Sequence, residues 1–275
     1  MRNKLLFILF LIVISYNAQT KRFIYDVEYK KDSTSNVKTK ENYHLDINGK
    51  AVDYYTRDYF IADSLIVNNI PFPETLKLKP SSIVTHIIGF NNFEEYDLLE
   101  NTIINLKSKD LQSWTLTNET KVVKTLNLQK AQTYWGGRHW TAWFTEEIPF
   151  QVGPYKFHGL PGLIVELFDD NGNYKFELVN SQNLKNNAEN QYLKVAKQRS
   201  VPVNWEKYKN TKLKYYQSPI DFIKNAKGSS QKSEFFLNDG TIVNPNNSRE
   251  INKTLRQAIK KFNNPINLDS AIQYD

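Results

Sequence analysis

The sequence predicts an α+β protein: a predominantly antiparallel β-sheet, curved or half-barrel in shape, with a few helices near the C-terminal end. Two observations predict this class. Short segments that alternate apolar and polar residues, joined by turn residues, recur between residues 23 and 179. Helix signals become frequent only after about residue 200. Consecutive strands joined by hairpins give an antiparallel sheet, and curvature limits the length of its exposed edges.

The strand predictions rest on alternation and on the turn residues that interrupt it. Asn48-Gly49, Asp169-Asp170-Asn171-Gly172 and Asn238-Asp239-Gly240 are hairpin-turn sequences, because Asn and Gly tolerate the positive φ that such turns require. Three prolines within residues 61–82 remove backbone donors, so we expect loop with short extended pieces there. The predicted strands are 23–29, 43–47, 51–60, 83–90, 95–100, 103–106, 114–116, 122–126 and the longer segments 128–148 and 163–179.

Three helices are predicted late in the chain. Asn204, Ser218 and Ser248 are the expected N-caps. Pro219 suits a first helical turn, and Gly228 ends that short helix. Apolar residues at helical spacing support the first and third helices. They are Trp205, Tyr208, Leu213 and Tyr216 in the first, and Ile251, Leu255, Ile259 and Phe262 in the third.

Residues 1–18 are predicted to be a secretory signal peptide. Arg2 and Lys4 precede an unbroken apolar run over 5–14, and Ala18 precedes a polar stretch. The alternative is an uncleaved anchor, but the run is about half of the roughly 20 residues that a spanning helix needs. We therefore expect residues 19–275 to form one β-rich domain, with helical segments after about residue 200, that is exported and does not span a membrane.

Composition narrows the class of protein further. The chain has 275 residues, of which 40% are hydrophobic, and its 16 Tyr, 16 Phe and 5 Trp are typical of a folded core. It contains no Cys. That absence excludes disulfides, thiol catalysis, thiolate metal sites and lipid attachment through an N-terminal cysteine.

Charge is uneven along the chain, whose formal net charge is +7. Residues 41–110 hold 6 Lys/Arg and 11 Asp/Glu, whereas residues 185–261 hold 16 and 6. This asymmetry is compatible with contact to an acidic surface or to anionic lipid. We favour the simpler interpretation that the lysines are scattered singly on solvated faces, because clustering is the diagnostic feature and it is weak here. We expect no nucleic-acid partner, because an exported protein rarely meets one.

The most unusual stretch is residues 130–177. It contains Gly136-Gly137-Arg138, the aromatic run 140–145, and the hexapeptide Gly159, Leu160, Pro161, Gly162, Leu163 and Ile164. This stretch closely resembles the GLPGLI family of exported proteins, common in Bacteroidetes-type bacteria and named for that hexapeptide. The resemblance extends more loosely over nearly the whole mature chain. It implies no known activity, since the family has none established. Many members also carry a Cys near residues 128–133, and this chain has none there.

The hexapeptide has a structural interpretation of its own. Pro161 fixes φ at the first central position of a type II turn, and Gly162 is expected to take positive φ at the second. Residues 163–165 would then enter the core as a strand. The alternative is that residues 159–164 form a functional loop.

Side chains near the hexapeptide are the candidates for ligand binding. We expect Arg138 to stack on an aromatic ring. With the aromatic strand it would form a binding surface. The candidate ligand-binding residues are Arg138, Trp140, Trp143, Phe144 and His158.

No residue pattern identifies catalytic chemistry, a cofactor or a metal. His139, His158, Glu146 and Glu147 are the only local group that could bind a metal, and their spacing matches no recognised motif. Adjacent strand residues point to opposite faces, so Glu146 and Glu147 are poorly placed as paired catalytic carboxylates. We therefore predict no catalytic residues, no metal site and no cofactor.

Three function hypotheses remain. The favoured one is a non-enzymatic binding or accessory protein for an unknown envelope protein or an apolar ligand, held by the curved sheet and its aromatic strand. The second is an uncharacterised hydrolytic or metal-dependent enzyme. The third is a structural subunit of an outer-membrane complex. The expected location is the periplasm, the outer membrane or the outside of the cell.

Overall fold

The structure is a computed structural model that describes residues 20–73, 76, 83–100, 102–184, 190–228, 234–237 and 240–275. The predicted signal peptide lies outside the described residues, as do Asn238 and Asp239 of the third predicted turn. No helix in the described ranges is long and apolar enough to cross a membrane.

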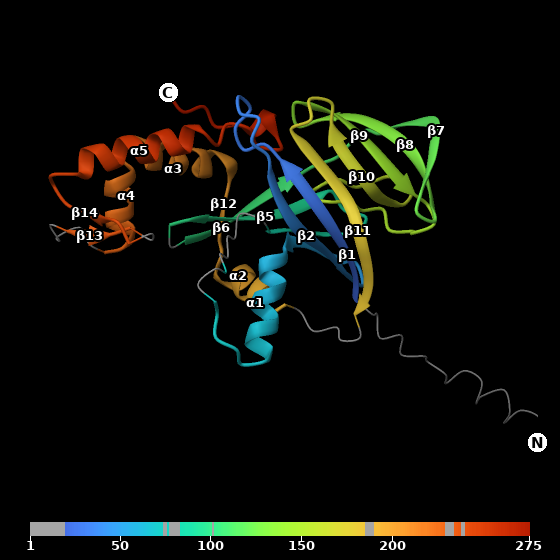
Figure 1. Cartoon of the computed structure of the whole chain (residues 1–275), viewed down its shortest axis with the longest axis horizontal. Coiled ribbons are helices and arrows are strands. Elements are labelled where there is room, and N and C mark those ends of the chain that lie inside the picture. Colours follow the sequence, from blue (N-terminus) through green and yellow to red (C-terminus); the bar gives the residue numbers. More distant parts are fainter. Residues whose placement is uncertain are drawn as a thin grey trace, which may run out of the picture.

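One large, strongly curved open sheet dominates the molecule (Figure 1). Its twelve strands follow the order β12-β6-β5-β4-β3-β2-β1-β11-β10-β9-β8-β7, and every neighbouring pair is antiparallel except β12 with β6. The predicted fold class is confirmed. The strands are β1 Thr20–Tyr29, β2 Thr39–Asn48, β3 Ala51–Thr56, β4 Ile83–Ile87, β5 Asn92–Leu99, β6 Thr102–Lys109, β7 Thr115–Val123, β8 Leu126–Trp135, β9 Arg138–Thr145, β10 Leu163–Asp169, β11 Tyr174–Leu184 and β12 Val201–Val203.

The described residues form five α-helices in two groups (Figure 1). A pair packs against the outside of the sheet, and three more lie beyond its β6 end, next to a small β13–β14 ribbon. A 3-10 turn, Leu268–Ser270, follows them. The elements are α1 Arg57–Val67, α2 Gln191–Arg199, α3 Trp205–Gln217, α4 Pro219–Ala226, α5 Ser248–Lys260, β13 Phe235–Phe236 and β14 Ile242–Val243.

The late helices match the sequence closely. The Asn204 side chain accepts a hydrogen bond from the Lys207 amide and caps α3, and Pro219 occupies the first turn of α4. The third helix corrects the prediction by one residue, because Ser248 belongs to α5 and Asn247 precedes it.

The region after residue 50 corrects the prediction more substantially. The predicted strand over 51–60 ends at Thr56, and the predicted loop begins with the second half of α1. The helix forms because Tyr59 and Ala62 bury against the outer face of the sheet, together with Leu193 of α2. That tertiary packing outweighs the weak local helix signal.

Two hairpin turns are confirmed, and one predicted break is not. Asn48 pairs with Ala51 across the first turn, where Gly49 has φ +61°. Gly172 has φ +63° in the turn between β10 and β11. The segments predicted as separate strands, 114–116 and 122–126, both contribute to the single strand β7, which ends at Val123 before β8 begins at Leu126. The pairing of β7 with β8 is irregular between Leu116 and Thr120.

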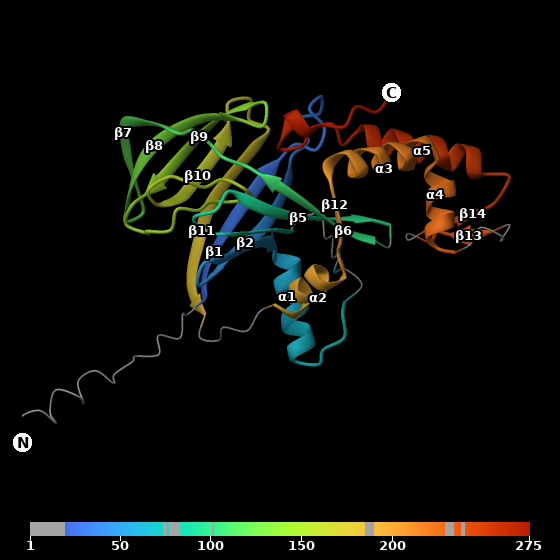
Figure 2. The same ribbon diagram turned by 180° about the vertical axis from the view of Figure 1, so that it is seen from behind.

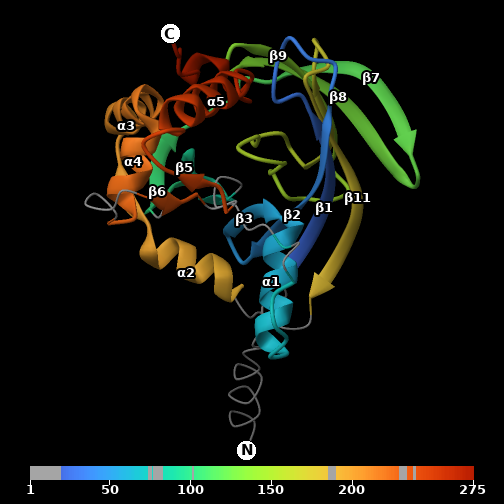
Figure 3. The ribbon, with the colours of Figure 1, turned by 60° about the vertical axis from the view of Figure 1, so that its left-hand side comes forward.

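Three hydrophobic clusters stabilise the fold. The largest fills the inside of the curved sheet, the second lies under α1 and α2, and the third joins α4, α5 and the β13–β14 ribbon. The connection between β9 and β10, residues 146–162, runs inside the curve (Figure 3). Its Val152, Phe157 and Leu160 are fully buried in the largest cluster. The prediction of a single domain over 19–275 stays a prediction.

Candidate functional site

The aromatic strand β9 turns Trp140 and Phe144 into the protein. Trp140 and Phe144 are fully buried, and the Trp140 ring lies 4.7 Å from the Phe157 ring. The indole N–H of Trp140 donates to the carbonyl of Trp135 at 3.0 Å. The side chains proposed to bind a ligand are therefore in contact with the chain's own residues. Their role in ligand binding stays a prediction.

Trp143 and His158 have different surroundings. Trp143 is half-buried on the other face of β9, with the Lys121 ammonium 4.4 Å from its ring centre. His158 is buried, and its ring nitrogens face the Lys156 carbonyl and the Asn91 side-chain oxygen at 3.1 and 3.0 Å. Burial lowers the pKa of His158. Neither side chain points into a shared site with Arg138.

The two glycines of the hexapeptide are required at their positions for different structural reasons. Gly159 has φ +90°, a conformation that other residues rarely adopt. Gly162 does not have positive φ, so the predicted type II turn is wrong. A Cβ on Gly162 would lie 2.0 Å from the Thr145 carbonyl oxygen. The glycine is thus required because the loop backbone passes directly against the end of β9.

The four residues considered for metal binding do not converge. His139 is exposed beside the Tyr134 ring, whereas His158 is buried among other partners. Glu147 accepts hydrogen bonds from the Asn127 backbone and side chain. Among the described residues, no cluster of three or more His, Asp or Glu side chains is arranged to hold a metal ion.

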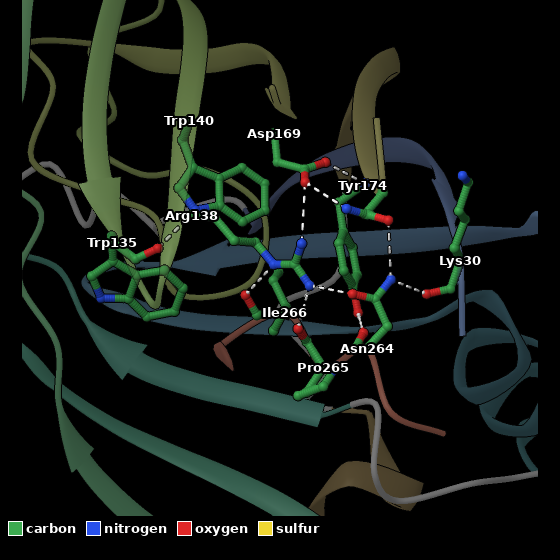
Figure 4. Close-up of polar contacts among 10 residues, drawn as sticks. Lys30, Trp135, Arg138, Trp140, Asp169, Tyr174, Asn264, Pro265 and Ile266 are labelled. Atoms are coloured by element: carbon green, nitrogen blue, oxygen red, sulfur yellow. Dashed lines mark hydrogen bonds and ion pairs between the residues drawn. The ribbon is translucent and has the colours of Figure 1, made fainter. Parts of the chain in front are cut away.

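Arg138 is the centre of a buried polar cluster (Figure 4). Its guanidinium pairs with the Asp169 carboxylate at 3.1 Å, and both side chains are almost completely buried. It also donates to the Asn264 side chain at 2.5 Å and to the carbonyls of Pro265 and Ile266 at 2.8 and 3.2 Å. The predicted stacking is confirmed with the Tyr174 ring, 5.1 Å away. These charge-assisted hydrogen bonds hold residues 264–266, the start of the C-terminal segment, in one position.

Arg138 and its partners thus clamp residues 264–266, and neighbouring contacts extend this clamp further along the C-terminal segment. The Tyr174 hydroxyl donates to the Asn264 carbonyl at 2.6 Å, and the Leu268 amide donates to the Gly136 carbonyl at 2.8 Å. A Cβ on Gly137 would lie 2.9 Å from the Leu268 side chain. The Gly136-Gly137-Arg138 sequence therefore docks residues 264–269 against the sheet.

The docked segment forms one wall of a cleft of about 740 Å³. Strands β5 and β6 form the floor, and α3 and the end of α5 face the C-terminal segment across it. In Figure 2 these elements lie next to one another at the β6 end of the sheet. The lining is mixed, with lysines and aromatic rings. The aromatic side chains are Tyr155, Trp205, Tyr208, Tyr215, Phe262 and Tyr274, and the lysines are Lys107, Lys109, Lys156, Lys212 and Lys260.

Lys156 is a buried cation in the cleft wall. Its ammonium lies 3.0 Å from the Glu95 carboxylate, 3.4 Å from Asp110 and 3.1 Å from the Ser108 hydroxyl. Burial disfavours its charge, but the two carboxylates outweigh burial and raise the pKa of Lys156. The preceding Tyr155 is a non-glycine residue at φ +58°, and its hydroxyl donates to Glu95 at 3.1 Å. Such local strain persists only where surrounding contacts fix it.

A second ion pair fixes α3 against the floor. The Tyr208 hydroxyl and the Lys212 ammonium contact the same Asp97 oxygen at 2.6 and 2.8 Å. Burial and the Asp97 charge raise the pKa of Tyr208, so its hydroxyl stays protonated and donates. The cleft therefore has a preorganised wall.

Sequence reasoning did not find this cleft. Its residues come from four separate stretches, 95–110, 155–156, 205–215 and 259–274, and no local motif joins them. The signals available were the charge asymmetry and the strongly basic helices after residue 200. Those signals indicated a basic surface on the late helices, and they did not indicate a cavity beside it.

A sequence model of a family described as "Protein of unknown function (Porph_ging)" matches residues 103–166. That range ends within β10 and includes the aromatic strand and the hexapeptide. No curated protein matches the chain significantly in sequence.

The similar solved structures include PNGF-II in two space groups. In the C2 and P21 forms the identities are 16% and 17%, and the TM-scores are 0.47 and 0.49. The matches cover 68% and 70% of this chain and 31% and 33% of PNGF-II, so the chain spans about a third of that protein's length. A third is the LolA superfamily protein NE2245 from Nitrosomonas europaea, with 5% identity, a TM-score of 0.29, and coverage of 64% of this chain and 90% of that one. None of these likenesses bears on function.

Proposed function

We propose that the chain is an exported member of the GLPGLI family that acts as a binding or accessory protein in the cell envelope. The basic residues Arg2 and Lys4 and the apolar run over 5–14 support export, with cleavage after Ala18. The unsubstituted hexapeptide at 159–164 supports the family. The cleft of about 740 Å³ between sheet, helices and C-terminal segment is the observation that carries binding, since ligand sites are concave and have a few fixed polar groups.

The occupant is proposed to lie in this cleft and not against Trp140 and Phe144. Residues 146–162 already cover that strand from inside the curve, with Phe157 and Leu160 fully buried there. An apolar ligand inside the sheet would have to displace this segment and its backbone contacts with β9. A partner protein that inserts a segment into the cleft displaces no part of the core.

Site-specific photo-crosslinking in the native host tests the proposal. A photoreactive amino acid replaces Trp205, which lines the cleft and is 37% exposed. The matched control replaces Tyr134, an exposed aromatic on β8 outside the cleft. We expect a discrete adduct from position 205 and none from position 134. Equal adducts at both positions, or none at 205 while native mass spectrometry finds a ligand bound elsewhere, would contradict a cleft function.

A hydrolytic enzyme is the second candidate. The observation that favours it is the Ser108 hydroxyl, which lies 3.1 Å from Lys156 and also contacts Asp110 in the cleft. A lysine can accept a serine proton only when it is neutral. The raised pKa of Lys156 opposes that role. We therefore expect no labelling of the purified protein by a fluorophosphonate probe, and labelling that Ser108→Ala abolishes would favour the enzyme.

A structural subunit of an outer-membrane complex is the third candidate. Strand β7 is an edge of the twelve-stranded sheet, and its Leu116 and Val122 are 49% and 68% exposed. Exposed edges can pair with another chain. The irregular pairing near Leu116 shortens the regular edge, and this irregularity favours the cleft as the site of binding.

A further inference from the structure

Resting on the proposed function, we propose that the cleft receives an extended, acidic peptide segment of a partner protein, which carries at least one aromatic side chain. Three features of the described residues lead to this class of ligand. They are the charge around the cleft, an acidic aromatic segment that the protein already binds to itself, and exposed aromatic rings at the rim.

The charge of the cleft lining is positive. It includes five lysines, Lys107, Lys109, Lys156, Lys212 and Lys260, and two carboxylates, Glu95 and Asp110. Within the cleft, Lys156 and Lys212 are neutralised by Glu95, Asp110 and Asp97. Lys109 and Lys260 are exposed, and among the described residues neither has a carboxylate within ion-pair distance. These two lysines can pair with an incoming acidic group.

The C-terminal segment already packs beside the cleft. Asp275 accepts a hydrogen bond through its backbone carbonyl from the Tyr216 hydroxyl of α3, and the Tyr274 ring lies 5.0 Å from the Tyr216 ring. Arg256 and Lys260 of α5 lie 5.8 Å from the Tyr216 ring centre, and Arg256 also donates to the Tyr216 carbonyl at 3.1 Å. A Tyr-Asp pair of this chain thus packs on α3 through its ring and its backbone, on a tyrosine that two cations of α5 also contact.

The rim offers unoccupied aromatic surface. Trp205 and Phe262 line the cleft and are 37% and 62% exposed. Two tyrosine hydroxyls in the wall are already engaged, in the bonds from Tyr155 to Glu95 and from Tyr208 to Asp97. An aromatic side chain of a ligand would contact these exposed rings, and buried aromatic anchors dominate the affinity of peptide interfaces.

Display of random twelve-residue peptides against residues 19–275 tests this inference. We expect enriched peptides to contain both Asp/Glu and aromatic residues. In Lys109→Glu/Lys260→Glu, an enriched peptide should bind at least about tenfold more weakly, because two favourable charge contacts become repulsive. The matched control Arg249→Glu/Lys253→Glu makes the same change in charge on α5, away from the cleft lining, and should leave binding within about twofold.

The alternative outcomes are informative in separate ways. Enrichment of basic or purely apolar peptides, or binding that survives Lys109→Glu/Lys260→Glu, would overturn the inference. If no peptide is enriched but the crosslink at position 205 captures an acidic polysaccharide, the cleft function stands and the peptide class is wrong. If the crosslink at 205 is also absent and native mass spectrometry finds a ligand bound elsewhere, the proposed function fails with it.

Discussion

The inside of the curved sheet and the cleft beside the C-terminal helices use similar side chains in opposite ways. Inside the sheet, Trp140, Phe144 and Phe157 are fully buried in one hydrophobic cluster. The Arg138 guanidinium donates to the Asp169 carboxylate and to backbone carbonyls of the chain itself. In the cleft, Trp205 and Phe262 are exposed, and Lys109 and Lys260 form no ion pair among the described residues. The first region is committed to the fold, and the second has side chains left over for a partner.

This difference suggests how the two regions depend on each other. The Arg138 cluster holds residues 264–266, and the residues that follow form one wall of the cleft. The packed interior therefore contributes to binding indirectly, because it positions one wall of the cleft. If that is correct, changes inside the sheet should cost stability, and changes on the cleft should cost binding alone.

The largest expected effect comes from Arg138→Ala. The substitution leaves Asp169 and Asn264 buried without their cationic partner, and breaking a buried pair costs about 3–5 kcal/mol of unfolding free energy. Urea denaturation measures the loss. Hydrogen exchange should show residues 264–275 losing protection before the sheet does. Protection that falls uniformly along the chain would contradict the clamp.

Gly162→Ala should come next, with a loss of about 3 kcal/mol, because a Cβ would lie 2.0 Å from the Thr145 carbonyl oxygen. Gly172→Ala is the control. Gly172 has positive φ but no atom within 4 Å of an added Cβ, so only backbone strain of about 1 kcal/mol is expected. Equal losses in the two variants would show that close approach of the loop to β9 is unimportant.

His86 should make stability depend on pH. Its ring is buried beside Phe93 and His158, and neither ring nitrogen has a hydrogen-bond partner in the part of the chain that the structure describes. Burial lowers the pKa of His86 to about 4. The unfolded state binds a proton at about pH 6.5, so stability is lost as pH falls from about 6.5 towards 4. The loss from this residue could reach about 3 kcal/mol.

His86→Phe tests this assignment, because it keeps the ring and removes the titrating nitrogens. The variant should be more stable than the parent at pH 5 and should lose less stability between pH 7 and pH 5. Thermal unfolding at the two pH values measures both effects. His44, whose pKa burial also lowers to about 4, accounts for part of the remaining slope. An unchanged pH profile would mean that His86 is not a major source of the dependence.

The sequence predicts the interior better than the cleft, for a physical reason. Alternation and turn residues are local signals, so the antiparallel sheet, the Asn48-Gly49 turn, the cap at Asn204 and the first-turn position of Pro219 could be predicted. Helix α1 could not, because Tyr59 packs in one cluster with Leu193 of α2, more than 120 residues away. Asn190, whose side chain caps α2, was a signal that could have been used.

The candidate site depends almost entirely on long-range placement. Arg138 could be singled out from its motif, but its acceptors at residues 264–266 lie about 130 positions later. The role of Gly162 followed from the approach of another strand, and a turn rule alone assigned it incorrectly. Local chemistry thus singled out Arg138 and Gly162 without identifying what they contact, and none of the predicted ligand-binding residues lines the cleft.

The smallest effect on stability is expected from a double substitution in the cleft, and this variant separates the cleft from the packed interior most clearly. Lys109→Glu/Lys260→Glu replaces two exposed side chains that make no ion pair within the described residues, so the unfolding free energy should change by less than about 0.5 kcal/mol. The same variant is expected to lose peptide binding at least about tenfold. A loss of binding without a loss of stability would separate the cleft from the packed interior. A stability loss as large as that of Gly162→Ala would show that these lysines belong to the fold, and the distinction between the two regions would fail.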